Sequence, residues 1–247
     1  MGKRYGQYCP VAIASEVLGE RWTILVVMVL ADGFHRFNQI QRALPRISAS
    51  TLNQRLKSLE LAAIVEKQPL EGSESDGYFL TEAGEELGEL VYQLGAWGHR
   101  WGRDLEPDDL DPEHLIWSMH MRMNLAAMPK ERTTIAFEFS DQPATKRYFW
   151  IVAENGVSQA CLKNPGYDET LKVTAHLQPF TYAWRGFTSL REEIRKGNIR
   201  IQGPRALVRA FPDWLLLSML AGEERRREGR ERQLQIGRPA GPDASPS

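Results

Sequence analysis

Several kinds of segment are scarce in this sequence, and each scarcity excludes a class of protein. Only two cysteines occur, Cys9 and Cys161, far apart in the chain. They exclude a disulfide framework and a zinc site built on cysteines, and they fit a reducing cytosol. The longest apolar run, residues 24–31, is too short to span a bilayer, and the N-terminus lacks the apolar core of a signal peptide. We therefore expect a soluble cytoplasmic protein without a membrane span.

Enzyme motifs are missing as well. The sequence has no glycine-rich phosphate loop, no serine elbow and no cluster of metal-binding side chains. Its histidines are scattered, and His114 and His120, six residues apart, are poorly spaced for one helix face. We therefore predict a protein that is not an enzyme, with no catalytic residues, no metal site and no cofactor.

Composition divides the chain into parts. We predict a mostly helical domain over residues 1–104, an acidic linker with prolines over 105–112, and a second domain of mixed helix and strand over 113–221. Residues 222–247 are charged and then rich in Gly, Pro and Ser. They have almost nothing to bury, so we expect a disordered tail, in which Arg225–Arg227 end a solvated helix.

Two helices are predicted first. Cys9 precedes Pro10, which suits the first position of a helix because its missing N–H costs nothing there. The expected apolar face of this helix comprises Val11, Ala14, Val17 and Leu18. A second helix, residues 22–31, is apolar nearly all round, so we expect it to be buried until Asp32 and Gly33 end it.

A helix-turn-helix follows. The first helix is expected over residues 36–44 and ends at Pro45, which cannot continue a helix. The second is expected over 48–60, with Ser48 as N-cap and with Leu52, Leu56 and Leu59 toward the core. Between residues 36 and 57 every charged residue is cationic, five in all, whereas the whole chain has a net charge of −1. Concentrated positive charge beside a polar helix face is typical of DNA-binding proteins.

The polar face of the second helix supplies the candidate DNA contacts. Side chains of this kind can reach base edges in the major groove. We predict base contacts from Ser50, Thr51, Gln54 and Lys57, phosphate contacts from Arg36, Arg46 and Arg55, and further contacts from Ser48 and Asn53. The alternative is a structural helix pair with a solvated basic face.

A hairpin and a long helix complete this domain. Residues 64–70 and 78–80 are expected to be two strands joined by a turn, and a helix is expected from Thr81 to Trp101. Its apolar residues form a seam at heptad spacing, suited to pairing with a second copy: Leu87, Leu90, Leu94, Trp97 and Trp101. The same helix holds four glycines, which could let other backbones approach closely.

The first hundred residues resemble the HxlR-type winged-helix regulators of bacteria and archaea. The resemblance rests on CPVAIASEVLGERWTILVV, RFNQIQRALPRISASTLNQRLKSLE and YFLTEAGEEL. It implies a dimeric transcription factor that binds near-palindromic DNA. Two features depart from the family: Ser50 stands where a basic residue is frequent, and the loop of the wing is acidic at Glu71, Glu74 and Asp76. We expect this loop to stay off the DNA.

The second domain starts with an expected helix over residues 115–128, with Leu115, Met119, Met123 and Ala126 on one face. Strand-like runs are expected over 133–139, 148–152, 157–162, 171–175 and 199–201, with a further segment at 179–184 and helices at 190–196 and 204–220. The segment FTYAWRGFTSLREEIRKGNIRIQGPRALVRAFPDWL resembles the end of sterol-carrier-protein-2-like domains. There a helix, a short strand and a last helix complete a sheet, so the predicted fold class is α+β throughout.

That second resemblance implies an apolar pocket for an acyl chain or another apolar molecule. Candidate lining residues are Met119, Met123, Phe137, Phe149, Trp184, Phe187 and Trp214, although plain core packing would explain the same residues.

Together these features predict a homodimeric transcriptional regulator, a repressor, that senses an apolar ligand through its second domain. In one alternative Cys9 is the switch, because the positive end of a helix makes a thiol placed there more reactive; some relatives sense oxidants or electrophiles through this cysteine. Cys161 lies in a strand pattern and is expected to pack. In another alternative the protein is a lipid carrier whose helix-turn-helix binds other proteins.

Overall fold

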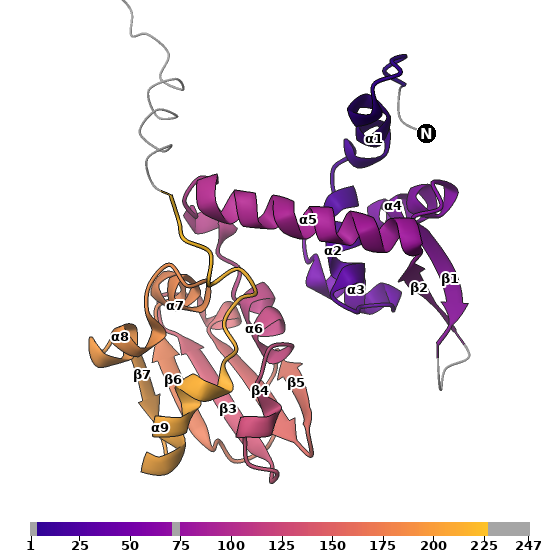
Figure 1. Ribbon diagram of the computed structural model, residues 1–247. Coiled ribbons are helices and arrows are strands. Elements are labelled where there is room, and N and C mark those ends of the chain that lie inside the picture. Colours follow the sequence, from indigo (N-terminus) through magenta and orange to yellow (C-terminus); the bar gives the residue numbers. More distant parts are fainter. Residues whose placement is uncertain (1–3, 71–74, 227–247) are drawn as a thin grey trace, which may run out of the picture.

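The structure is a computed structural model that describes residues 4–70 and 75–226. An N-terminal helical domain and a C-terminal sheet domain are joined at the C-terminal end of one long helix, α5 (Figure 1). Glu71 and Glu74 of the acidic wing loop lie outside the described residues, as does the predicted tail from residue 227 on. Within the part described, no helix is long and apolar enough to cross a membrane.

The N-terminal domain is a winged helix-turn-helix with every predicted element present. Its elements are α1 (Pro10–Leu18), α2 (Thr23–Ala31), α3 (Phe37–Ala43), α4 (Ala49–Leu61), β1 (Val65–Pro69), β2 (Asp76–Leu80) and α5 (Glu82–Trp101). The strands β1 and β2 pair antiparallel as the wing. Residues from α2, α3 and α4 form the core, and the three leucines predicted to face inward from α4 are at most 1% exposed.

Local chemistry fixes α5 against the wing. The hydroxyl of Thr81 accepts a hydrogen bond from the N–H of Gly84 and donates one to the carbonyl of Ala63. A Cβ atom at position 84 would lie 2.2 Å from the carbonyl oxygen of Ile64, so only glycine fits this crossing. The predicted close approach of backbones at a glycine is therefore confirmed at this position.

The predicted burial of α2 is confirmed for five of its nine residues but wrong for its outer side, and the predicted apolar face of α1 is not buried. Leu25 and Met28 of α2 are 40% and 36% exposed, since a helix that is apolar on every side cannot bury all of them against one small core. The helix α1 has no buried residue, and Val11 of its predicted apolar face is 72% exposed. Both helices therefore present apolar side chains on the outer surface of this domain.

The C-terminal domain is an α+β sheet domain. Its helices and strands are α6 (Pro112–His120), β3 (Thr133–Phe139), β4 (Tyr148–Glu154), β5 (Val157–Cys161), β6 (Leu171–Ala175), α7 (Leu177–Trp184), α8 (Leu190–Arg195), β7 (Ile199–Gln202) and α9 (Arg205–Trp214). Short 3₁₀ turns lie at Pro107–Asp109 (η1), Leu125–Ala127 (η2) and Ala144–Lys146 (η3). The strand order is β5-β4-β3-β6-β7; β3 and β6 are parallel and the other neighbours are antiparallel.

The core of this domain lies between one face of the sheet and the helices. Ile135, Phe137 and Phe139 alternate along β3 and pack with Phe180 of α7 and Phe211 of α9. On the other face, Glu138 of β3 forms an ion pair with Lys172 of β6 at 2.9 Å. The alternation follows from the two-residue period of a strand, with apolar side chains inward and a charged pair outward.

Two helix ends were predicted too far along the chain. The helix predicted over 115–128 ends at His120, and the one predicted to reach Leu220 ends at Trp214. Both segments leave helical geometry to meet each other: Met123 forms an isolated β-bridge with Leu215, and the N–H of Asn124 donates to the carbonyl of Trp214 at 2.7 Å. The segment 179–184 belongs to α7.

The contacts between the two domains include the hydrogen bond from the hydroxyl of Tyr92 to the carbonyl of Met219, and two further areas. The first is between α6 and α3 with the segment that precedes it, where the rings of Trp117 and Phe34 lie 5.9 Å apart. The second is at the end of α5, where residues 221–226, the C-terminal arm, run back over the helix. Gly186 allows this path, because a Cβ there would lie 2.3 Å from the carbonyl oxygen of Ala221.

The described part of the predicted tail is ordered by specific contacts, contrary to expectation. Arg225 is not at a solvated helix end: its side chain is 15% exposed, and its guanidinium donates to Asp104 at 2.6 Å and to the carbonyl of Gly102 at 3.1 Å. It also lies over the ring of Phe187 at 4.6 Å. A run of charged residues is expected to be solvated only when the fold brings no hydrogen-bond acceptors close to it. Here the end of α5 brings such acceptors to Arg225, the carbonyl of Gly102 and the carboxylate of Asp104.

Candidate nucleic-acid interface

The helix α4 presents the polar surface that the sequence predicts. Its N-cap Ser48 accepts a hydrogen bond from the N–H of Thr51 at 3.1 Å, and its hydroxyl also contacts those of Thr51 and Ser50. Ser50, Asn53, Gln54 and Lys57 are exposed, and Thr51 is partly exposed. Since the leucines of α4 lie in the core, this polar face points away from the domain and is open to a partner.

The three arginines predicted to contact phosphates differ in their surroundings. Arg36 is exposed at the N-cap of α3. Arg55 forms an ion pair with Glu20 at 3.2 Å, and its side chain is only 12% exposed. Arg46 lies in the turn between α3 and α4 and donates to the carbonyl of Asp108 in the linker. Arg36 and Arg46 are therefore exposed, whereas Arg55 is largely covered.

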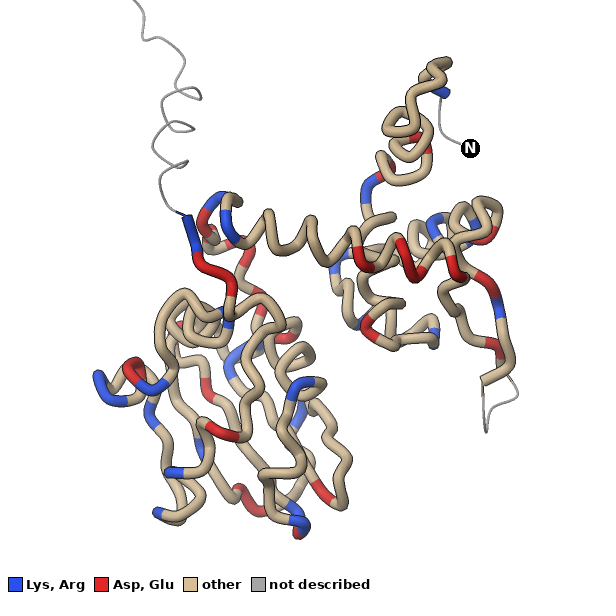
Figure 2. Tube along the Cα trace, viewed as in Figure 1, with Lys and Arg blue, Asp and Glu red and all other residues tan. Residues whose placement is uncertain are grey.

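Charge is unevenly distributed over this domain (Figure 2). The acidic residues of α5 gather on its first half, at Glu82, Glu85, Glu86 and Glu89. In the wing, Lys67 lies over the ring of Tyr78 at 5.4 Å and near Glu60 at 3.7 Å. The segment from α3 through α4 keeps its excess of cations, since Glu60 near its end is the first acid after Asp32.

Contacts of the wing that the sequence did not indicate involve His35. Its ring stacks on Phe79 of β2 at 4.0 Å, and its Nδ1 lies 3.0 Å from the carbonyl oxygen of Tyr78. This residue links the wing to the start of the helix-turn-helix. Only the fold brings these distant positions together, so no spacing in the sequence could have indicated the contact.

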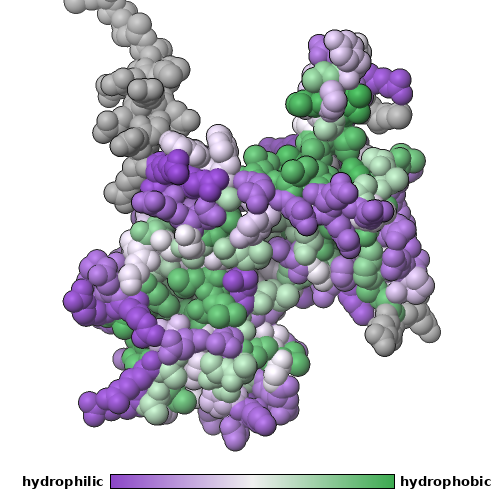
Figure 3. Space-filling model, viewed as in Figure 1, coloured by the Kyte–Doolittle hydropathy of each residue, from purple (hydrophilic) through white to green (hydrophobic). Residues whose placement is uncertain are grey.

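An apolar surface runs along α5. Four members of the predicted seam are exposed, with Leu90 at 65%, Leu94 at 49%, Trp97 at 57% and Trp101 at 37%, whereas Leu87 packs partly on the core. Figure 3 shows hydrophobic residues beside α5 and at the base of α1. Exposed tryptophans and leucines in a row are typical of a surface that binds another protein.

The two thiols have different surroundings. Cys9 is the N-cap of α1, partly exposed, and makes no side-chain capping hydrogen bond. Cys161 ends β5, and burial raises the pKa of its thiol, which makes it less reactive at neutral pH. Both are free cysteines.

Most of the predicted pocket residues are packed in the core. Met119, Met123, Phe137, Phe149 and Trp214 are at most 6% exposed and belong to one apolar cluster. Phe187 instead lines a cavity of about 410 Å³ at the domain junction, with Tyr182, Asp104 and residues of the arm. Another cavity, about 460 Å³, lies near Met128 and Lys130. Core packing thus accounts for five candidates, and among the described residues no cluster could hold a metal ion.

Comparison with known proteins identifies the N-terminal domain. The HxlR-like helix-turn-helix family matches residues 17–106. The regulator YvaP of Bacillus subtilis is 34% identical over 99 residues, covering 40% of this chain and 89% of its own. YodB of the same organism is 40% identical over 103 residues, covering 41% and 89%. The chain belongs to the HxlR-like helix-turn-helix family.

A solved structure is also similar. Quinone-bound YodB from B. subtilis aligns with 41% identity and a TM-score of 0.32, over 36% of this chain and 96% of that one. The relatives are named as HTH-type transcriptional regulators, so this HxlR-like protein is a DNA-binding regulator. The family match ends at residue 106 and does not assign the C-terminal domain.

Proposed function

We propose that this HxlR-like protein regulates transcription as a homodimer that inserts α4 into the major groove of a near-palindromic operator. The polar face of α4 supports this most strongly, because its exposed residues can bond to base edges. In the proposal, bases are read by Ser50, Thr51, Gln54 and Lys57, with Ser48 and Asn53 at the border, while phosphates are bound by Arg36 and Arg46. Arg55 is left to support α4 through Glu20.

The proposed dimer pairs α5 with α5 of a second copy. The exposed seam supports this, because burying Leu90, Leu94 and Trp97 removes apolar surface from water at about 25 cal/mol per Å². Two copies related by a twofold axis would present two α4 helices to successive major grooves, as a near-palindromic site requires.

The C-terminal domain is proposed to be sterol-carrier-like and to sense an apolar or acyl-chain molecule. The succession of α8, β7, Gly203 and α9 supports the likeness, since the short strand pairs at the sheet edge between two helices. The compact core implies that a ligand enters by displacing packed side chains or binds at the junction cavity beside Phe187. Trp184, partly buried with an unpartnered indole N–H, remains a candidate.

A second candidate switch is Cys9. Its position as a partly exposed N-cap supports this, and the relative YodB has a structure solved with bound quinone. A helix N-terminus stabilises a thiolate, which attacks oxidants and electrophiles.

The decisive experiment is fluorescence anisotropy with DNA from upstream of the protein's own gene, at two salt concentrations. Specific binding that weakens steeply with salt supports the regulator. Release by a fatty acid assigns the switch to the C-terminal domain; release by a thiol oxidant, lost in Cys9→Ser, assigns it to Cys9. Binding of fatty acid without specific DNA binding would favour a lipid carrier instead.

A further inference from the structure

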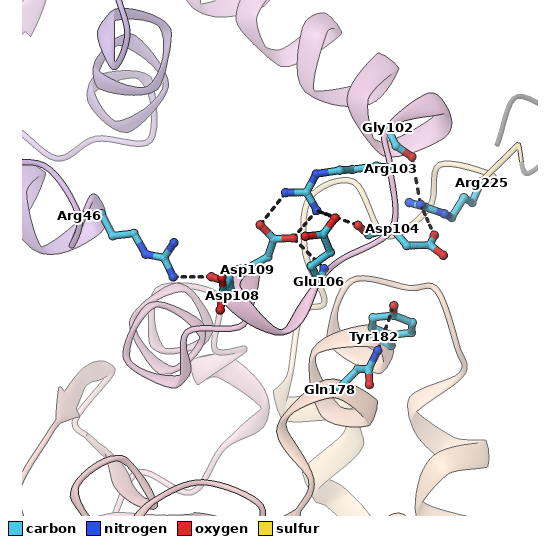
Figure 4. A network of polar contacts seen from close by, with 10 residues as sticks. All are labelled: Arg46, Gly102, Arg103, Asp104, Glu106, Asp108, Asp109, Gln178, Tyr182 and Arg225. Carbon is cyan, nitrogen blue, oxygen red and sulfur yellow. Dashed lines mark hydrogen bonds and ion pairs between the residues drawn. The ribbon is translucent and has the colours of Figure 1, made fainter. Parts of the chain in front are cut away.

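Arg46 is held by the linker between the domains. It lies two residues before the N-cap of α4, and its guanidinium donates to the carbonyl of Asp108 in η1. Figure 4 shows this contact beside a group of charged linker residues. A side chain expected to meet a phosphate thus has an oxygen acceptor from its own chain.

The linker is ordered by its own ion pairs. The guanidinium of Arg103 donates to both carboxylate oxygens of Asp109, at 2.5 and 2.8 Å, and the N–H of Glu106 donates to the same carboxylate at 2.8 Å. The hydrogen bonds from Arg103 and from the Glu106 amide, with a smaller contribution from the charge of Arg46, lower the pKa of Asp109 to about 2. We call Arg46, Arg103, Glu106, Asp108 and Asp109 the linker network.

The charge of this segment resembles that of a DNA backbone. Residues 104–111 contain five acids and no Lys or Arg. The carbonyl that accepts from Arg46 therefore lies within a strongly negative segment, and a phosphate would likewise offer an oxygen acceptor with negative charge.

Domain docking holds the linker in this position. Trp117 of α6 packs near Phe34 at 5.9 Å, and α6 contacts α3, whose last residue, Ala43, lies three residues before Arg46. The linker joins α5 to α6, so any movement of α6 away from α3 also moves η1 away from the turn that carries Arg46.

We propose that the acidic linker is an autoinhibitory substitute for a DNA phosphate: it occupies Arg46 in the free protein and must release it for full DNA binding. This inference rests on the proposed function, since it requires Arg46 to bind DNA. In this way the C-terminal domain would control the affinity for the operator, because a movement of α6 away from α3 frees Arg46 to bind one phosphate.

The test compares two linker variants that remove the same charge, measured by anisotropy on operator DNA. Asp109→Asn breaks the pairs with Arg103, whereas the control Asp108→Asn leaves those pairs and the backbone acceptor of Arg46 in place. We expect Asp109→Asn to bind DNA more tightly, by roughly threefold at low salt, and to steepen the slope of log affinity against log salt by about 0.9, the value of one phosphate contact. Asp108→Asn should change affinity less and leave the slope unchanged.

The same variants in an Arg46→Ala background make the test specific. If the linker acts through Arg46, Asp109→Asn no longer steepens the slope there. An equal gain with and without Arg46, or equal effects of the two linker variants, would overturn the proposal. Absence of specific DNA binding by the wild-type protein would overturn the proposed function and this inference with it. Suppose the two linker variants bind DNA equally. Faster tryptic cleavage after Arg103 in Asp109→Asn would in that case show that the network orders the linker without controlling Arg46, which overturns the proposal.

Discussion

The glycines of α5 allow one prediction to be worked out from geometry. Gly84 and Gly98 occupy the same helix, yet a Cβ at position 84 would lie 2.2 Å from the carbonyl oxygen of Ile64, and one at position 98 would meet nothing within 4 Å. The contact at position 84 is more than 1 Å shorter than an ordinary van der Waals contact of about 3.4 Å, and the obstructing atom belongs to the backbone.

Alanine should therefore have opposite effects at the two positions. In a helix, alanine is favoured over glycine by about 1 kcal/mol, and Gly98→Ala should gain close to that amount. Gly84→Ala gains the same preference but must push α5 away from the wing, and because the obstructing atom is backbone the overpacking cost lies toward the upper end of the usual range, about 2–3 kcal/mol. We expect a net loss of about 1–2 kcal/mol, equivalent to a melting temperature lower by roughly 2–8 °C for a chain of this size.

Thermal unfolding followed by circular dichroism measures both variants under the same conditions. A stabilised Gly84→Ala protein would refute the placement of α5 against Ile64. A destabilised Gly98→Ala protein would show instead that another part of the protein, for example a second copy, covers position 98. The open space around a Cβ at this position would then be contradicted. DNA binding gives a second readout, since a displaced α5 moves the wing relative to α4.

Three further predictions concern bases, assembly and pH. Gln54→Ala should relax base preference with little change in the salt slope, measured by anisotropy on operator variants; unchanged preference would remove Gln54 from the base contacts. Trp97→Asp should raise the dimer dissociation constant at least tenfold in sedimentation experiments, whereas Gln93→Asp, outside the seam, should not; equal effects would refute pairing through the seam. Burial, then the charges of Arg185 and Arg225, lower the pKa of His99 below the usual 6.5, so stability should fall as pH drops below about 6.5, and less in a His99→Gln protein; identical pH profiles would contradict this.

The elements that the sequence predicts well depend on local chemistry. The helix α4 is recognisable because its cap and its leucine stripe lie within thirteen residues. The end of α6 is not, because Met123 leaves the helix to meet Leu215, more than ninety residues away. Spacing can indicate where one segment turns, but it cannot indicate which distant strand or helix will satisfy its backbone groups.

The same limit applies to the candidate site. The exposure of Ser50, Gln54 and Lys57 follows from helical periodicity around buried leucines. The partners of the arginines do not, since Glu20 reaches Arg55 and Asp108 reaches Arg46 only through the fold. A count of cations predicts that a surface attracts phosphate; the tertiary contacts decide which of those cations are available.

Three parts of the protein meet at the C-terminal end of α5: the exposed seam, the linker and the arm. The seam proposed for dimerisation reaches it at Trp101, the linker leaves from it at Arg103, and the arm returns to it through Arg225. His99 lies there between Phe187 at 4.8 Å and Arg185, and its neutral form is favoured first by burial and then by the charges of Arg185 and Arg225. A change in this cluster therefore cannot stay local: it alters the contacts of the linker that holds Arg46 and of the helix that would pair two copies. A ligand bound in the junction cavity beside Phe187 would contact Asp104 at the start of the linker and the arm that returns to α5, and would therefore act on both.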